Sequence, residues 1–141
     1  MRKNVAALLF ALLAAGTAAA EPPAGDDPIG RYVFPPDKVL SHAQEIGLDD
    51  AQKKSIRGEL QKAQTKFLDF QFEMQPETEK MAKLLQEKPV DEAKVLAQAD
   101  RVMSLEREVK KTQLTLLIRI KNLLTAAQQA KMSELQRAES R

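Results

Sequence analysis

Apolar residues recur every three to four positions along the stretch between residues 56 and 84. The members of this first stripe are Ile56, Leu60, Ala63, Phe67, Phe70, Met74, Met81 and Leu84. Spacings that alternate between four and three residues are typical of a helix that packs lengthwise against another helix. Pro76 lies within the stripe and cannot donate a backbone hydrogen bond to Phe72, so we expect a helix that kinks there but continues.

A second apolar stripe follows a short polar turn at Glu87–Lys94, "EKPVDEAK". The turn contains Pro89, and the acidic residues after it suit the first turn of a new helix. This helix is expected from about Asp91 to Leu123, and apolar residues recur in it every seven positions, at Val95, Val102, Val109, Leu116 and Leu123. Two long helices joined by a tight turn predict an antiparallel hairpin. Its two stripes should face each other, with Ile56, Leu60, Phe67 and Phe70 opposite Val95, Val102, Val109 and Leu116.

Prolines and glycines set the boundary of the helical part. Residues 21–36 hold five of the seven prolines and predict an extended lead-in. A short helix is expected from Lys38 to Ile46, with Asp37 as its N-cap and Gly47 as its stop. We therefore predict an all-α fold class, with a helical domain over residues 37–138 and a polar tail at 139–141.

Two similar five-residue phrases begin 76 positions apart in the chain, "LDDAQ" and "LTAAQ". In each, the second residue suits an N-cap, because its side-chain oxygen can accept a hydrogen bond from the backbone N–H three residues later. The glutamine at that third helical position can reach back to the N–H of the cap, and the leading leucine can pack down and fix the entry angle. Each phrase thus predicts a helix start after a sharp turn. The residues with these roles are Leu48, Asp49, Gln52, Leu124, Thr125 and Gln128.

The first twenty residues have the layout of a secretory signal peptide. Arg2 and Lys3 are followed by an apolar run from Val5 to Ala15 and by small residues that end at Ala20. A retained membrane helix is the alternative, but sixteen apolar or small residues fall short of the ~20 needed to span a bilayer. We expect cleavage after residue 20 and an exported, periplasmic protein with no stable membrane anchor.

Cleavage changes the charge of the chain. The formal net charge of +2 comes from Arg2 and Lys3, because the leader contains no acid. Their removal lowers the number of basic residues from 22 to 20, which equals the number of acidic residues. This balance argues against a nucleic-acid partner, since such binding relies on clustered positive charge. The sequence has no cysteine, so it forms no disulfide.

The repeated phrase, the leader and the helical pattern together resemble the Spy/CpxP family of periplasmic proteins, whose signature is an LTxxQ motif that occurs twice. The second copy matches in full, whereas the first has Asp49 in place of threonine. The stretch "LLIRIKNLLTAAQQAKMSELQ" is similar to members described as heavy-metal sensors or refolding chaperones. The resemblance covers about residues 36–138. It implies a four-helix protomer that pairs into a cradle-shaped homodimer and acts in envelope stress.

Candidate chemistry is sparse. The chain has one histidine, His42, with neither a Gly-rich phosphate loop nor a Ser/His/Asp arrangement around it, so we do not expect an enzyme. The resemblance implies that metal-sensing relatives use histidines one helical turn apart, but the residue four positions after His42 is Ile46. His42 is thus the only weak candidate for a metal ligand, and a surface or half-buried histidine is the alternative. We expect no cofactor, with a divalent metal ion possible under a sensor hypothesis.

Some apolar residues lie outside the first stripe. Leu68 and Phe72 are four residues apart on an adjoining face of the helix and widen its apolar surface. They either pack against the first and last helices, form a dimer interface, or line a surface for a client protein. Met74 and Met81 add flexible side chains of the kind that promiscuous surfaces use. Our candidate client-binding residues are Leu68, Phe72, Met74 and Met81.

Two hypotheses of function follow from the sequence. The main one is an ATP-independent periplasmic chaperone or envelope-stress adaptor that binds unfolded or signalling envelope proteins. The alternative is a periplasmic heavy-metal sensor or metal-resistance accessory protein. A structural helical dimer without a client of its own is a third possibility.

Overall fold

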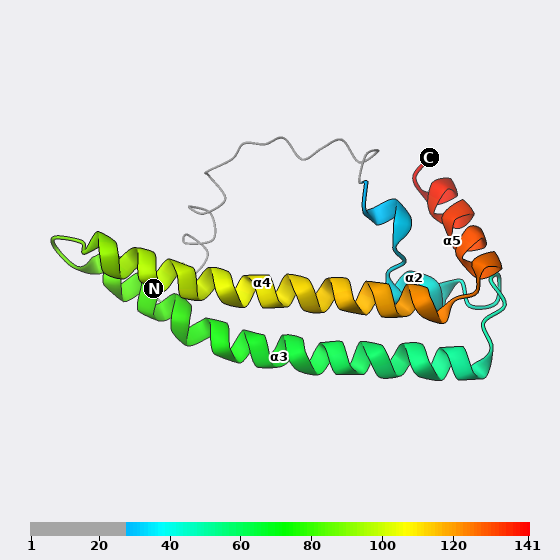
Figure 1. The fold of residues 1–141 in the computed structure, drawn as a ribbon, viewed down its shortest axis with the longest axis horizontal. Helices are drawn as coiled ribbons and strands as arrows, with labels where there is room; N and C mark the ends of the chain where they lie inside the picture. Colours follow the sequence, from blue (N-terminus) through cyan, green and yellow to red (C-terminus); the bar gives the residue numbers. More distant parts are fainter. Residues whose placement is uncertain (1–27) are drawn as a thin grey trace, which may run out of the picture.

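The computed structural model describes residues 28–141, and within them every regular element is a helix (Figure 1). A 3-10 turn, η1 (Gly30–Tyr32), precedes four α-helices: α2 (Pro36–Ser41), α3 (Asp50–Gln86), α4 (Glu92–Leu123) and α5 (Ala126–Glu139). The predicted all-α fold is confirmed. The proposed signal peptide and residues 21–27 of the lead-in lie outside the described residues.

Helices α3 and α4 form the long antiparallel hairpin that the two stripes predict (Figure 1). Asp91 is the N-cap of α4, and its Oδ1 accepts from the backbone N–H of Lys94 at 3.1 Å. Pro76 lies inside α3, which continues through it to Gln86. Figure 1 shows α3 changing direction in the half that leads to the hairpin tip, as expected of a proline inside a helix.

The facing of the two stripes is confirmed at the open end of the hairpin but not along its whole length. At the open end, Ile56 and Ala63 of α3 share a buried cluster with Leu116 and Ile120 of α4. In the tip half of α4, the buried residues are instead Gln98 and Leu105, while Val95, Val102 and Val109 are half-buried. Gln98 and Leu105 come three residues after Val95 and Val102, a spacing that places them on the same side of the helix as these valines. The valines are thus the less buried members of one helix face.

Polar side chains join α3 and α4 both near the open end and near the tip of the hairpin. Near the open end, Arg119 donates to Glu59 at 2.9 Å across the helix pair. In the tip half, the buried Gln98 donates to both the side chain and the backbone carbonyl of Glu77, at 2.6 and 2.8 Å. These bonds satisfy the amide nitrogen of Gln98, which accounts for a polar residue inside the helix pair.

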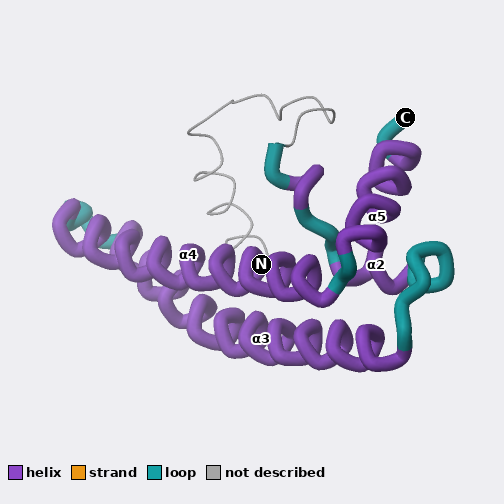
Figure 2. The backbone as a smooth tube through the Cα atoms, turned by 45° about the vertical axis from the view of Figure 1, so that its right-hand side comes forward, coloured by secondary structure: helices purple, strands orange, loops and turns teal. Residues whose placement is uncertain are grey.

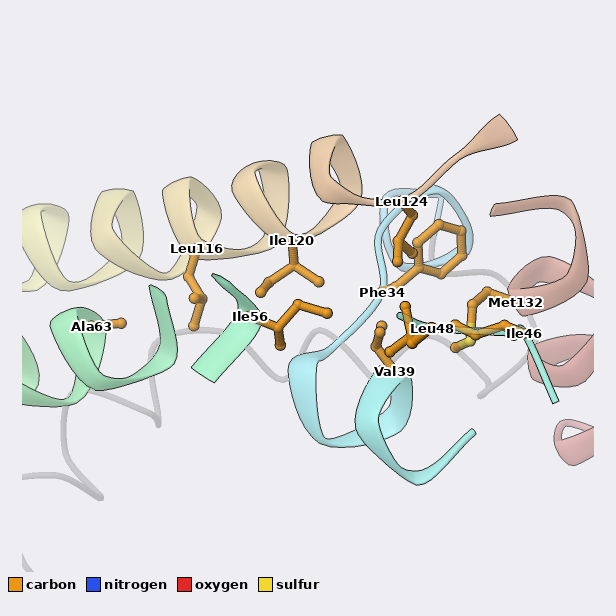
Figure 3. Packing of buried hydrophobic residues seen from close by; sticks show 10 residues of the cluster. All are labelled: Phe34, Val39, Ile46, Leu48, Ile56, Ala63, Leu116, Ile120, Leu124 and Met132. Carbon is orange, nitrogen blue, oxygen red and sulfur yellow. The ribbon is translucent and has the colours of Figure 1, made fainter. Parts of the chain in front are cut away.

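The hydrophobic core gathers where the N-terminal segment and α5 meet the open end of the hairpin (Figures 2 and 3). Phe34 from the lead-in and Met132 from α5 are almost fully buried there. Leu48 and Leu124, the leading residues of the two phrases, belong to the same cluster. The predicted packing of these leucines is confirmed. Helices α3 and α5 each begin two residues after a leucine that is buried in the core.

The first helix differs from the prediction. It is α2, Pro36–Ser41, and not Lys38–Ile46, and Pro35 occupies the N-cap position without a side-chain hydrogen bond. The predicted cap, Asp37, lies inside the helix, because the fixed φ of Pro36 suits the first helical position. At the other end, the Ser41 hydroxyl donates to the carbonyl of Lys38, and residues 42–47 form turns. Gly47 closes them with a positive φ of 68°, which glycine adopts without strain.

Candidate functional site

Both repeated phrases form the predicted capping boxes. In the first, the Asp49 carboxylate accepts from the backbone N–H of Gln52 at 2.7 Å, and Gln52 Oε1 accepts from the N–H of Asp49 at 3.1 Å. In the second, the Thr125 hydroxyl accepts from the N–H of Gln128 at 3.2 Å, and Gln128 Oε1 accepts from the N–H of Thr125 at 2.9 Å. The predicted starts of α3 and α5 are thus confirmed.

The two glutamines also bind each other, which the sequence analysis did not foresee. Gln52 Nε2 donates to Gln128 Oε1 at 2.7 Å, and Gln128 Nε2 donates to Gln52 Oε1 at 3.0 Å. Each Nε2 also donates to a backbone carbonyl near the other phrase, that of Leu123 at 2.8 Å and that of Gly47 at 3.1 Å. The phrase therefore occurs twice because its copies form one junction. The identical position of glutamine in both copies was the available clue.

His42 lies between two carboxylates at the edge of the core. Its Nδ1 is 2.7 Å from Glu45 Oε1, and its Nε2 is 3.1 Å from Glu139 Oε1 at the end of α5. The other oxygen of Glu139 accepts from Lys38 Nζ at 2.6 Å. Hydrogen bonds to Glu45 and then Glu139 raise the pKa of His42 above its ordinary 6.5. Those from Lys38 and His42 lower the pKa of Glu139 below its ordinary value.

This arrangement does not fit a metal site within one chain. The two nitrogens of an imidazole point in opposite directions, so Glu45 and Glu139 cannot both reach an ion bound to either nitrogen of His42. Among residues 28–141, His, Cys, Asp and Glu side chains form no group of three or more that could hold a metal ion. Soft and borderline ions are held by several converging N and S ligands. His42 is therefore placed as an ion-pair centre between two acids.

The candidate client-binding residues differ in exposure. Leu68 is 52% exposed and Phe72 is 69% exposed on α3. Met74 is half-buried, and Met81 is buried in the hairpin. Leu68 and Phe72 thus form the accessible part of this surface.

Helix α4 carries a further set of exposed apolar residues, which we call the α4 strip. Its members are Leu96, Met103, Leu114 and Ile118. Leu96, Met103 and Leu114 are seven and eleven residues apart, spacings that return to the same side of a helix. The sequence analysis did not identify this strip as a surface, because it followed the seven-residue repeat of the neighbouring valines. The spacing of the strip could nevertheless be read from the sequence. Apolar residues therefore cover more of the circumference of α4 than α3 alone can bury.

No helix among residues 28–141 combines the length and the apolar character that crossing a bilayer requires. The exposed apolar residues of α3 and α4 lie on helices that also carry many charged residues. They are thus separate strips on amphipathic helices.

Comparison with known proteins gives one match. A protein-family model described as heavy-metal resistance matches residues 3–131, which include the hairpin and both repeated phrases. This family is related to Spy/CpxP-like periplasmic proteins, but the match is to the heavy-metal resistance model and not to Spy/CpxP itself. No curated protein and no solved structure matches the chain. Of the two hypotheses from the sequence, the match favours the heavy-metal alternative over the chaperone.

Proposed function

This chain belongs to the heavy-metal resistance family, and we propose that it is a periplasmic accessory protein of heavy-metal resistance. The family match over residues 3–131 is the observation that carries the proposal. The secretory layout of residues 1–20 supports the compartment. The proposal assigns the chain no catalytic step and no nucleic-acid partner.

We propose that the accessory protein acts through contacts with other proteins. The proposed role does not include metal binding at His42, because the carboxylates of Glu45 and Glu139 do not converge on one point where an ion could bind. The exposed pair of Leu68 and Phe72 and the α4 strip support protein contacts instead. Burial of apolar surface contributes about 25 cal/mol per Å², so strips of this kind favour association with another apolar surface. The partners we propose are a second copy of the chain and signalling or unfolded proteins of the envelope.

The distribution of charge supports the second copy as one partner. The tip half of the hairpin, residues 69–107, carries nine acidic and six basic residues. The open half, residues 50–68 and 108–123, carries three acidic and nine basic residues. An antiparallel pair of hairpins sets each acidic tip against a basic open half, which satisfies the self-complementarity of a twofold interface.

The proposal predicts a change in metal tolerance. Host cells that lack the protein are expected to stop growing at a lower concentration of zinc, copper, nickel or cobalt than cells that carry it. Restoring the native gene should recover tolerance to at least one of these metals, measured as the concentration that halves the growth rate. Equal tolerance with and without the protein, for all four metals, would contradict the proposal.

A second candidate function, an ATP-independent holdase, is favoured by the exposure of Leu68 and Phe72. If it is correct, the purified exported chain slows aggregation of an unfolded client at near-stoichiometric ratios without nucleotide, as followed by light scattering. Changing both Leu68→Ser and Phe72→Ser should weaken this protection, because the serines offer no apolar surface to the client.

A matched control makes this experiment specific. Gln64→Ser with Gln71→Ser places two serines on the same helix at exposed positions and should protect the client as well as the native chain does. Protection that the apolar double variant retains in full, or that both double variants lose equally, would count against the holdase. Far-UV circular dichroism of both variants checks that helicity is kept.

A further inference from the structure

An ionic cluster joins the end of α5 to α2 and the turn that follows α2. Glu139, the last residue of α5, contacts His42 through one carboxylate oxygen and Lys38 of α2 through the other, at 3.1 and 2.6 Å. Glu45, from the turn after α2, contacts the opposite nitrogen of His42 at 2.7 Å. The His42 side chain is 17% exposed. A partly shielded imidazole is thus the centre of a bridge between α5 and the N-terminal segment.

The bridge depends on the protonation state of the His42 imidazole. An ionised carboxylate only accepts hydrogen bonds, and a neutral imidazole has only one N–H to donate. His42 faces a carboxylate oxygen at each of its two nitrogens. Both contacts are therefore hydrogen bonds only when both nitrogens carry protons. We propose that His42 is a proton-operated latch, which fastens α5 to the N-terminal segment when both ring nitrogens carry protons and releases it when the proton on Nε2, which faces Glu139, leaves.

The latch lies beside contacts that cover the core. Gln136 of α5 donates to the carbonyl of Val33 at 3.2 Å, and Phe34 and Met132 are buried close by. Lys121 of α4 donates to the carbonyl of Tyr32 at 2.6 Å. After release of His42, the Lys38–Glu139, Gln136–Val33 and Gln128–Gly47 contacts remain among the polar ones described between the N-terminal segment and α5. Loosening is expected first at the last turn of α5 and at residues 33–42.

The latch has a defined pH window. The raised pKa of His42 means that its contribution is complete below the ordinary value of 6.5 and is lost as pH rises through the folded-state pKa. The lowered pKa of Glu139 means that its contribution is present above the ordinary value of 4.5 and is lost as pH falls through the folded-state pKa. The charged groups that face the ring are Glu45 and Glu139, and Lys38 acts through Glu139. The latch is thus closed at mildly acidic pH and opens toward alkaline pH.

NMR titration of the exported chain tests the latch directly, because His42 is the only histidine in the sequence. We expect a pKa of His42 above 6.5 in the native chain and a lower one in Glu139→Gln. Amide hydrogen exchange, corrected for the intrinsic effect of pH, should show the last turn of α5 losing protection as His42 deprotonates. In His42→Gln, this protection should be weak and should not change with pH in that range.

The control is Glu134→Gln, also on α5, whose carboxylate pairs with Lys131 at 3.2 Å and not with His42. This variant should leave both the pKa of His42 and the exchange profile as in the native chain. A pKa of His42 that Glu139→Gln does not lower would overturn the latch. Protection of α5 that does not follow the protonation of His42 would overturn it as well. Because these readouts involve neither metal tolerance nor client binding, they stand or fall separately from the proposed function.

Discussion

Gln128→Ala is expected to lower the free energy of unfolding by about 2–4 kcal/mol, because it removes the glutamine half of the capping box and leaves buried polar groups without partners. Gln128 is 8% exposed and takes part in four hydrogen bonds through its side-chain amide. Its loss removes the acceptor of the Thr125 N–H and the donor to the Gly47 carbonyl, and Gln52 loses one of its side-chain partners. Urea denaturation followed by circular dichroism measures the change.

Two comparisons separate the junction from simple capping. Thr125→Ala should cost about 0.5–2 kcal/mol and Thr125→Ser almost nothing, because a hydroxyl is all that the cap requires. In a double-mutant cycle with Gln52→Ala, Gln128→Ala should show a coupling energy of about 0.5–3 kcal/mol, as residues in one hydrogen-bond network do. Strictly additive losses would mean that each glutamine serves only its own helix.

Ile120→Ala is expected to lower the free energy of unfolding by about 2–5 kcal/mol, the usual cost of a cavity in a close-packed core. Ile120 is fully buried, and Figure 3 shows it opposite Ile56, with Leu116 and Leu124 on either side of it along the chain. Val102 is half-buried in the tip half of the same helix. Val102→Ala should therefore lower the free energy of unfolding by only about 1 kcal/mol. Similar losses for the two variants in urea denaturation would show that stability is spread evenly along the hairpin and is not concentrated at its open end.

The sequence predicts those parts of the fold that depend on local spacing. Apolar stripes with helical spacing on either side of Pro89 were enough to predict the hairpin, because each helix must bury its apolar face against a partner. The caps Asp49 and Thr125 were also predictable, since a capping box is complete within four consecutive residues. The bounds of α2 were not predictable in this way. Pro36 occupies the first helical position in place of the expected cap, and the helix ends at Ser41, whose hydroxyl donates to the carbonyl of Lys38, and not at the expected stop.

The functional contacts depend on distances that local spacing does not contain. Gln52 meets Gln128 across 76 residues, and His42 meets Glu139 across 97. The sequence could list Glu45 as a neighbour of His42, but only the return of α5 to the N-terminal segment adds the second carboxylate. The α4 strip is a different case, because its spacing was visible. The sequence could not predict how much of the surface of α4 stays exposed when α3 is the only long helix packed against it.

We propose that this member of the heavy-metal resistance family acts through the exposed apolar residues of its hairpin. The most direct measurement compares metal tolerance in cells that carry the native chain, the Leu68→Ser and Phe72→Ser double variant, or the Gln64→Ser and Gln71→Ser control, at equal levels of exported protein. We expect the native chain and the control to restore tolerance, and the apolar double variant to fail although it unfolds at the same urea concentration. Full tolerance in cells that carry the apolar double variant would contradict the claim.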